Sequence, residues 1–235
     1  MSSPLPPGQR ESSAFHRFGL TQFAKRFPKE TSTRALVVAG NVSNELQLED
    51  ALAGLPRVEQ TCDFHCVTTW TFKALRWEGV RFVDFYRMVV LPQADPDPKA
   101  TLVALRGQDG ARTGMLLKDL LAPNVLLADR LNGEPMPIDH GAPLRLIAPD
   151  HYGYKSVKHL SRIELRSPAS GYRVSGLRLM DHTRARVALE ERGRAMPGWL
   201  LRYLYRPLIP GTVSLFAKAS RSRQAEDGVG GGTAD

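Results

Sequence analysis

The sequence predicts an α+β fold built on a mixed β-sheet with scattered helices. Short apolar runs bounded by turn residues outnumber the segments with helical spacing, and the two kinds do not alternate regularly. No glycine-rich loop follows a strand with the spacing of a nucleotide-binding motif, which argues against a doubly wound fold. With 235 residues, of which 42% are apolar and 24% charged, the chain can form one domain with a sizeable core.

Each predicted strand is a short apolar run that ends at turn residues. In chain order these strands cover residues 35–38, 46–48, 57–70, 101–105, 125–130, 144–148 and 159–165. Gly40 and Asn41 form the turn after the first strand, and the strongest turn in the chain is Asn132-Gly133-Glu134-Pro135. Apolar residues at helical spacing predict helices at 48–55, 80–90, 183–194 and 199–205, with one or two helical turns at 116–121.

Composition divides the chain into four segments. Residues 1–14 are rich in Pro, Ser and Gly and are expected to be flexible, and the glycine-rich tail at 220–235 is expected to be disordered. Between them lie a main domain at 15–168 and an Arg-rich extension at 169–219, which we expect to pack on the main domain. An amphipathic segment on an acidic membrane surface or a redox partner is the alternative for this extension.

Positive charge is concentrated in the last third of the chain. Residues 155–223 carry fifteen Lys or Arg and four Asp or Glu, whereas the whole chain has a net charge of +8. Such a region suits an anionic cofactor, a nucleic acid or an acidic membrane, or is a solvated face. Nucleic acid is disfavoured because the region has no blocks of like charge and no aromatic residues regularly interleaved with the bases. We expect no transmembrane segment and, without an apparent signal peptide, a cytoplasmic protein.

The two cysteines, Cys62 and Cys66, are too few for a disulfide framework. Their C-x3-C spacing lacks a second pair, so a structural zinc would need His65 or His140 as further ligands. Cys66 stands in HCVTTW at the predicted end of a strand, where a sulfur atom can face a cofactor. A buried core thiol is the alternative for this position.

Arg145 interrupts the apolar strand LRLIA at 144–148. A buried guanidinium is costly unless it meets an anion, and its planar fork suits phosphate or carboxylate oxygens. The segment GYKSVK that follows places Lys155 and Lys158 three residues apart beside a glycine, as in a loop that binds an anionic headgroup. The alternatives are a solvent-facing arginine and an ordinary surface turn.

Two motifs of the chain together resemble those of a known family. CVTTW at 66–70, followed by Trp77-Glu78-Gly79-Val80, is similar to a cysteine loop with a W-x-G-V segment. LNGEPMPIDHGAPLRLIAPDHYGYKSVKHLSRIEL at 131–165 is similar to N-G-x-P-L-P-x-x-H-G-x-P-x-R-L, Pro, Y-G-x-K-x-x-K. Both patterns resemble the molybdopterin-binding domain of the sulfite oxidase family. The resemblance covers residues 15–168, about two-thirds of the chain.

The resemblance implies a sulfite-oxidase-type mixed-sheet fold and an oxidoreductase that uses the molybdenum cofactor. Cys66 matches the thiolate ligand of the metal, a role for which a soft sulfur is suited. Cys62 matches no position of the motif. The positions that match pterin and phosphate contacts are His16, Arg17, His140, Arg145, Lys155, Ser156, Val157 and Lys158, with Ser156 and Val157 contributing backbone N–H groups.

The implied reaction is oxygen-atom transfer to or from a small oxyanion or sulfoxide substrate, such as sulfite. Tyr152, with Tyr154, is a candidate hydrogen-bond donor to an oxo group or to the substrate. The sequence shows no haem-attachment motif, so a separate electron-transfer partner, such as a cytochrome or a quinone, is expected. The alternatives are a pterin-binding module without catalysis and a basic protein that binds a membrane surface or nucleic acid.

Overall fold

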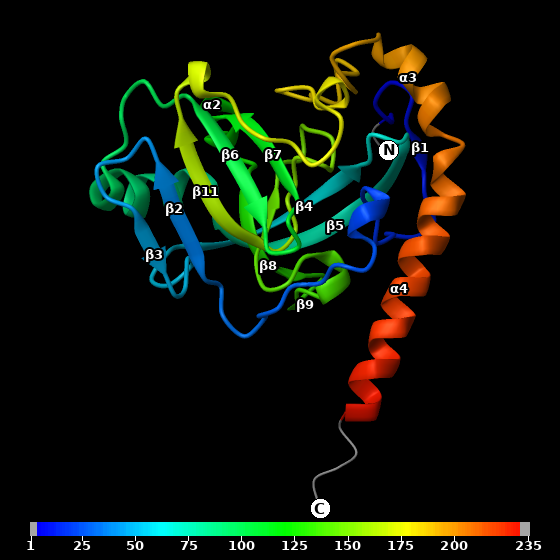
Figure 1. Cartoon of the computed structure of the whole chain (residues 1–235), viewed down its shortest axis with the longest axis horizontal. Helices are drawn as coiled ribbons and strands as arrows, with labels where there is room; N and C mark the ends of the chain where they lie inside the picture. The colour runs from blue at the N-terminus through cyan, green and yellow to red at the C-terminus, as the bar shows by residue number, and fades with distance from the viewer. Residues whose placement is uncertain (1–3, 231–235) are drawn as a thin grey trace, which may run out of the picture.

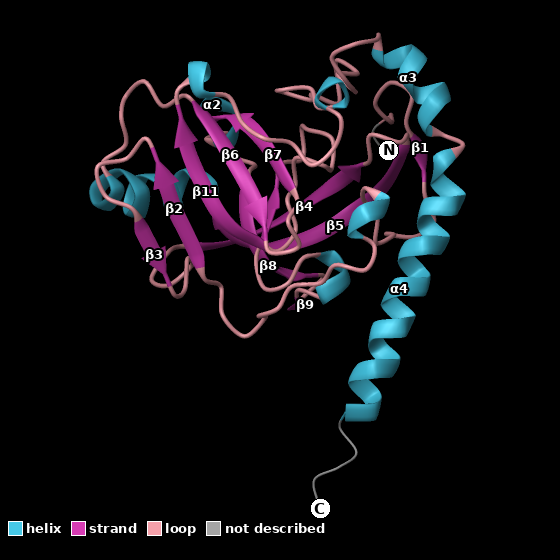
Figure 2. Ribbon diagram, viewed as in Figure 1, coloured by secondary structure: helices cyan, strands magenta, loops and turns pink. Residues whose placement is uncertain are grey.

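Two mixed β-sheets and one long C-terminal helix form the computed structural model, which describes residues 4–230 (Figures 1 and 2). The first sheet has the order β1 (Arg10–Glu11), β5 (Trp70–Arg81), β8 (Leu126–Leu131), β10 (Arg145–Ile147), with β4 (Arg57–His65) beside β5 and β9 (Glu134–Pro135) beside β8. The second has the order β3 (Leu46–Leu48), β2 (Leu36–Gly40), β11 (Leu160–Arg166), β6 (Leu102–Gly107), β7 (Arg112–Leu116).

Each sheet combines antiparallel neighbours with one parallel pair, β1 with β5 and β2 with β11. The helices are short and scattered, apart from the last. They are η1 (Thr21–Phe23), α1 (Phe82–Phe85), η2 (Tyr86–Ala94), α2 (Leu117–Leu120), η3 (Ile138–His140), η4 (Pro168–Ser170), η5 (Arg178–Met180), α3 (Gly198–Tyr205) and α4 (Leu208–Gly230). The α+β class with mixed sheets is therefore confirmed.

The first sheet is buried on both faces, which explains its continuous apolar strands. Leu127 and Leu146 belong to the large core that the two sheets share. Leu126 and Ile147, one residue along each strand, belong to a second core around Trp77 on the opposite face. Successive side chains of a strand point to opposite faces, so LRLIA is apolar at every position except Arg145.

The longest strand, β5, was missed by the sequence analysis. Leu75, Trp77 and Gly79 are buried in alternation, which is the pattern that predicts a half-buried strand. Gly79 is required by close packing, because a Cβ atom there would lie 2.0 Å from the carbonyl oxygen of Leu127 on β8. The helix expected at 48–55 is wrong, since residues 51–55 form turns.

Both ends of the described chain are more ordered than composition indicates. Arg10 and Glu11 pair with β5 as strand β1, although the segment through residue 14 was expected to be flexible. Helix α4 continues through residue 230, although the tail was expected to be disordered from residue 220. Residues 1–3 and 231–235 lie outside the described residues.

The start of α4 has a simple cause. Pro210 occupies the first turn of the helix, where a backbone N–H has no partner within the helix, so the proline does not interrupt it. In Figure 1, α4 stands as a rod along one side of the sheets. Among the described helices, none combines the length with the apolar character that crossing a membrane requires.

Candidate functional site

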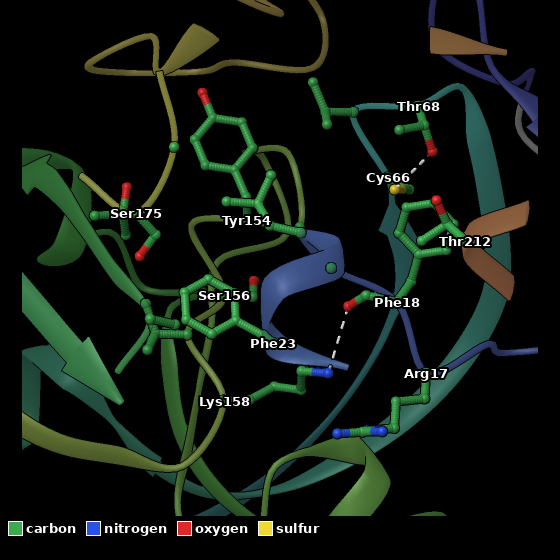
Figure 3. Close-up of a pocket in the computed structure, with 18 of the residues that line it drawn as sticks. Arg17, Phe18, Phe23, Cys66, Thr68, Tyr154, Ser156, Lys158, Ser175 and Thr212 are labelled. Atoms are coloured by element: carbon green, nitrogen blue, oxygen red, sulfur yellow. Dashed lines mark hydrogen bonds between the residues drawn. The ribbon is translucent and has the colours of Figure 1, made fainter. Parts of the chain in front are cut away.

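A cavity of about 490 Å³ opens between the first sheet, the N-terminal segment and α4 (Figure 3). Most of its wall is built from six segments of the chain, which lie within residues 15–23, 64–70, 109–113, 153–159, 174–181 and 205–216, and His140 and Arg145 complete it. Most of the residues that the resemblance singles out meet here. Those lining the cavity are His16, Arg17, Cys66, His140, Arg145, Ser156, Val157 and Lys158.

Cys66 lies in the turn that joins β4 to β5. Its backbone N–H donates to the carbonyl oxygen of Trp70 at 2.8 Å, and the N–H of Thr69 donates back to Cys66 at 3.0 Å. Thr69 has a φ of 87°, a left-handed conformation that costs a β-branched residue about 1–3 kcal/mol. A turn under such strain needs support from its neighbours.

That support comes from the two ends of the chain. The amide of Gln9 donates to the Cys66 carbonyl at 3.2 Å and accepts from the Thr71 hydroxyl at 3.0 Å. From the other side, Arg192 is fully buried and donates to the carbonyl oxygen of Val67 at 2.5 Å. The sequence analysis missed both residues, because nothing distinguishes this arginine or this glutamine among the others of the chain.

The Cys66 thiol is 7% exposed, and its sulfur lies 3.1 Å from the hydroxyl oxygen of Thr68. Burial raises the pKa of this thiol to about 11, while Thr68 and the charge of Arg192 act in the opposite direction. Without a metal the sulfur is therefore protonated at neutral pH. Metal binding would displace this proton, since only the thiolate is a ligand.

Arg145 is 3% exposed and lines the cavity. It donates to the His140 carbonyl at 2.6 Å, but its Nε atom has no hydrogen-bond partner among the described residues. Its guanidinium lies between 5 and 6 Å from the rings of Phe15, Phe64 and Trp77. Burial lowers its pKa to about 9, which shows how poorly this charge is compensated within the chain.

Two further cations accompany Arg145. Lys158 donates to the Phe18 carbonyl at 3.4 Å, and burial, followed by the charges of Arg145 and Arg17, lowers its pKa to about 7. Arg17 is 8% exposed, with its Nε atom unbonded and 3.4 Å from a carboxylate oxygen of Asp139. Three clustered cations beside a cavity favour an anionic ligand.

The two predicted histidines have different surroundings. The ring of His140 stacks on Phe15 with a centroid distance of 4.3 Å. Burial, helped by the charge of Arg145, lowers the pKa of His140 to about 3, so its imidazole is neutral. His16 lies edge-on to Trp70 with a centroid distance of 5.8 Å, on the N-terminal segment that covers the cavity.

The loop at 153–158 does not offer a ligand the two backbone N–H groups that the prediction assigned to it. The N–H of Ser156 donates to the Gly153 carbonyl at 3.1 Å and that of Val157 donates to the Lys155 carbonyl at 2.9 Å. These two N–H groups are therefore used within the loop rather than directed to a ligand. Gly153 is needed for close packing, since a Cβ atom there would lie 2.1 Å from the Phe64 ring.

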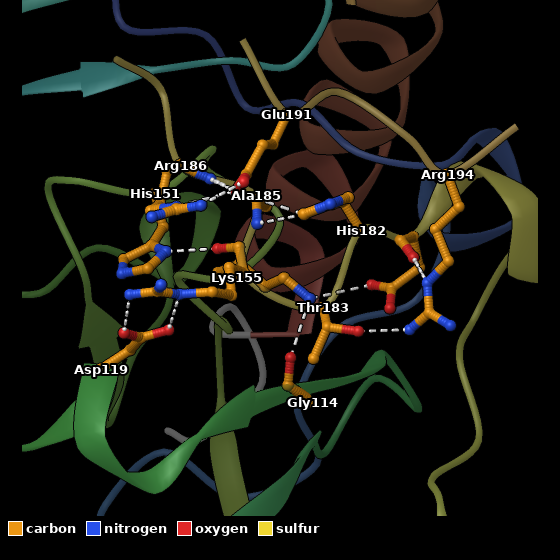
Figure 4. A network of polar contacts seen from close by, with 12 residues as sticks. Gly114, Asp119, His151, Lys155, His182, Thr183, Ala185, Arg186, Glu191 and Arg194 are labelled. Carbon is orange, nitrogen blue, oxygen red and sulfur yellow. Dashed lines mark hydrogen bonds and ion pairs between the residues drawn. The ribbon is translucent and has the colours of Figure 1, made fainter. Parts of the chain in front are cut away.

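Lys155 does not line the cavity. It is fully buried, and its ammonium donates to the Gly114 carbonyl at 2.8 Å and the Thr113 hydroxyl at 3.0 Å, with Asp181 at 3.1 Å (Figure 4). Its charge joins this loop to β7 and to the extension. The expectation that Lys155 contacts the cofactor directly is therefore corrected, because the loop turns between Lys155 and Lys158.

Tyr152 is also directed away from the cavity. It is fully buried in a small cluster with Ala185 and Val187, and the guanidinium carbon of Arg192 lies 4.9 Å from its ring centroid. Its hydroxyl has no hydrogen-bond partner among the described residues. The tyrosine that lines the cavity is Tyr154, whose hydroxyl donates to the His182 carbonyl at 3.3 Å. The catalytic role predicted for Tyr152 is therefore not supported by its position.

Helix α4 closes one side of the cavity. Phe216 is 1% exposed, and its ring lies 5.0 Å from the guanidinium carbon of Arg17 and 5.9 Å from the ammonium of Lys158. Ser220 fastens the helix to η3 by donating to a carboxylate oxygen of Asp139 at 2.7 Å. The extension therefore contributes directly to the wall of the site.

The comparison with known proteins identifies the family. Residues 24–172 match the family model of the oxidoreductase molybdopterin-binding domain. The chain belongs to this family. This molybdopterin-binding oxidoreductase has the molybdenum–molybdopterin cofactor, as its motifs imply. The matched residues end before α3 and α4, so the helices that close the cavity lie beyond the matched domain.

Several relatives are similar to this oxidoreductase. It is 40% identical over 168 residues to the uncharacterized oxidoreductase YuiH of Bacillus subtilis (strain 168), covering 69% of this chain and 79% of YuiH. It is 32% identical over 149 residues to the protein-methionine-sulfoxide reductase catalytic subunit MsrP of Gluconobacter oxydans (strain 621H), covering 55% of this chain and 46% of MsrP. It is also 32% identical over 155 residues to mitochondrial sulfite oxidase of Rattus norvegicus, covering 62% of this chain and 26% of the rat enzyme.

Among solved structures, the sulfane dehydrogenase SoxCD from Paracoccus pantotrophus aligns with a TM-score of 0.48 at 22% identity, covering 56% of this chain and 37% of that one. The oxidoreductase thus spans most of YuiH, but less than half of MsrP and about a quarter of the rat enzyme.

The cavity fits the cofactor in its donor set. The unbonded Nε atom of Arg145 and the ammonium of Lys158 offer buried positive charge that a pterin phosphate would neutralise, and Arg17, paired with Asp139, lies beside them. Cys66 provides a single soft sulfur on the same cavity. No three His, Cys, Asp or Glu side chains gather as the zinc alternative would require, among those that the structure describes.

Proposed function

We propose that this oxidoreductase transfers an oxygen atom to or from a small sulfur-oxo substrate, sulfite or a sulfoxide, with the Cys66 thiolate as the protein ligand of molybdenum. The observation that carries the proposal is that Cys66 lines one cavity with Arg17, Arg145 and Lys158. The relatives named sulfite oxidase and protein-methionine-sulfoxide reductase support this substrate class.

When bound, the cofactor supplies two-electron redox chemistry and an exchangeable oxo group. The chain's own residues bind and orient it. Arg145 and Lys158 hold its anionic part, and Thr68 donates a hydrogen bond to the Cys66 sulfur once that sulfur is deprotonated. The neutral ring of His140 adds a polar contact without adding a further charge.

Part of the cavity wall is apolar. Phe23, Leu177 and Met180 line it together with Leu20 and Val174, and Leu20 and Leu177 are also exposed at the surface. This wall would bury the organic group of a sulfoxide and exclude water from the reacting atoms. A sulfoxide with an organic group therefore suits this wall better than a bare oxyanion does.

We also propose that electrons are exchanged with a separate carrier protein or quinone. Oxygen-atom transfer changes the metal by two electrons, so the enzyme needs a second substrate that accepts or donates them. The relative MsrP is named a catalytic subunit, which supports a division of the reaction between chains.

The test compares Cys66→Ser with Cys62→Ser in protein purified from molybdenum-replete cells. Cys62 is a half-buried thiol on β4 that does not line the cavity, so it is a matched control. Turnover of sulfite with an artificial electron acceptor, and of a sulfoxide with an artificial donor, is measured beside metal and pterin content. Loss of the metal ligand should lower turnover more than about a hundredfold, since even neighbours of metal ligands contribute 10–100-fold.

The Cys66→Ser variant should still contain pterin, because the cations that hold it remain. The Cys62→Ser variant should keep its turnover. Full turnover in Cys66→Ser would remove the ligand assignment. A loaded parent protein that turns over neither substrate would instead remove the proposed reaction.

A further inference from the structure

Large apolar side chains are exposed on one part of the surface. Of the twelve large hydrophobic side chains that are exposed among the described residues, six belong to α3 and the first two turns of α4. These six are Trp199, Leu200, Tyr203, Leu204, Leu208 and Leu215. Trp199 and Tyr203 are 53% and 58% exposed, which is unusual for aromatic residues.

These side chains share one face of the helices. In α3, Trp199, Leu200, Tyr203 and Leu204 recur with a spacing of four residues, and Leu208 continues that spacing into α4. Leu201 and Tyr205 are buried and hold α3 on the protein, as Phe216 holds α4. The exposed side chains therefore differ from the buried ones that hold the helices, and we refer to them as the outer face of α3 and α4. Leu208 lies at the edge of this face, because it also lines the cavity.

The surroundings of the outer face are cationic. Residues 198–225 contain Arg202, Arg206, Lys218, Arg221 and Arg223 and no Asp or Glu. Arg206 and Arg10 also line a second cavity, of about 290 Å³, beside the start of α4. The carboxylate in its wall, Glu11, pairs with Lys73 at 2.8 Å. Arg206 donates to the Thr69 hydroxyl at 3.3 Å and to the Gly8 carbonyl at 3.4 Å, so this cavity presents the Arg10 guanidinium and the remaining nitrogen of Arg206 to a ligand.

We propose that the outer face of α3 and α4 docks the protein on the surface of an anionic lipid bilayer, with a lipid phosphate between Arg10 and Arg206. Tryptophan and tyrosine favour the headgroup region of a membrane, where the ring is buried and its polar atom stays hydrated. Leucines on the same face add apolar area, and nearby cations are attracted to acidic lipids.

The placement of the helices favours a lipid surface over a protein partner. In Figures 1 and 2, α3 and α4 form the outermost layer on one side of the molecule and run along its edge. A fluid headgroup layer can accept such an edge along its length. A protein partner would need a groove of matching shape, and an acidic protein is therefore the alternative occupant.

The test measures co-sedimentation of the full, cofactor-loaded chain with vesicles of phosphatidylcholine, with and without phosphatidylglycerol. We expect binding to the vesicles that contain phosphatidylglycerol, and weaker binding as salt is added. Arg10→Gln with Arg206→Gln should weaken binding about 25-fold, since each cation near an acidic surface contributes roughly fivefold. Trp199→Ser with Tyr203→Ser should weaken it at least as much.

The matched control is Met88→Ser with Leu91→Ser. These residues are 51% and 46% exposed and belong to η2, a segment that lies across the view from α4 in Figure 1. The control should bind like the parent. Equal binding to both vesicle types, no binding to either, or equal loss in the control would overturn the proposal. Absence of vesicle binding together with salt-sensitive binding to an acidic protein would assign the face to the alternative occupant. The measurement requires no turnover and so stands apart from the proposed reaction.

Discussion

Arg145 illustrates how a single buried residue indicates the chemistry of a site. Its position inside the apolar strand β10 predicts an anionic partner, and in the structure its Nε atom is buried without a hydrogen bond. A folded protein tolerates such a charge at a cost in stability, which a bound phosphate would offset. Its role in cofactor binding remains a prediction.

Replacing Arg145 by methionine separates these two effects. Arg145→Met should leave the cofactor-free protein equally or more stable, because a desolvated charge is removed and the volume is kept. It should also lower pterin retention after gel filtration about tenfold or more, as loss of a charged hydrogen bond does. Arg76→Met is the control, because Arg76 is an exposed arginine of β5. Unchanged pterin retention in Arg145→Met would contradict the phosphate role.

At the scale of elements, α3 and α4 each have one side that packs on the protein and another that is exposed. One side of α4 closes the cavity through Phe216, while the side chains of the outer face are exposed, Leu208 at the edge of the cavity included. The segment before them, at 173–194, has little regular structure, and its arginines bind carboxylates and backbone carbonyls. Arg184 pairs with Asp119 at 2.6 Å, and Arg194 donates to the Asp181 carbonyl at 2.8 Å (Figure 4). Part of the positive charge is thus used inside the fold.

Truncation of Phe216 tests the closure of the cavity by α4. In cofactor-free protein that carries Cys62→Ser, Phe216→Ala should increase the rate at which a maleimide labels Cys66 several-fold. The reason is that losing a buried aromatic ring costs about 3–5 kcal/mol, which favours local opening of α4. Leu215→Ala, on the exposed side of the same helix, is the control and should label like the parent. Equal labelling rates for both variants would show that α4 does not limit access.

For the whole molecule, the buried bases make stability depend on pH. The pKa of Lys158 is lowered by burial from 10.5 to about 7, and the pKa values of His140 and His159 are lowered by burial from 6.5 to about 3. Between the folded and the unfolded pKa of each of these groups, the unfolded chain binds a proton that the folded chain does not. The free energy of unfolding therefore rises with pH in these ranges. Above pH 9 the sign reverses for Cys66, whose pKa is raised by burial from 9.0 to about 11.

We therefore expect the denaturation midpoint of the cofactor-free protein to rise between pH 7 and pH 9, and to fall as the solution is acidified below pH 6.5. In the cofactor-loaded protein the rise above pH 7 should be smaller, because an anion beside Lys158 favours its charged form. Urea titrations of both forms at a series of pH values provide the measurement. A midpoint that declines from pH 7 to pH 9 in the cofactor-free protein would contradict this account.

The amino-acid sequence by itself determined the α+β class, the family and the cofactor of this protein. It did so because the family's motifs are local, and Cys66, Arg145 and Lys158 stand in short segments whose spacing is readable without a structure. It also placed most of the strands, since turn residues bound them. The strand β5 could have been found from the alternation of apolar and charged residues in Leu75-Arg76-Trp77-Glu78.

Only the tertiary structure decided which residues support the site. Gln9 and Arg192 hold the turn at Cys66 across 57 and 125 residues of sequence, and α4 reaches the cavity from beyond the matched domain. The same holds for Lys155, whose partners Gly114 and Asp181 lie far away along the chain. The spacing of lysines along a loop does not reveal whether a lysine side chain faces the cavity or the protein interior. Its direction depends on the buried acceptor groups that packing brings within hydrogen-bond distance.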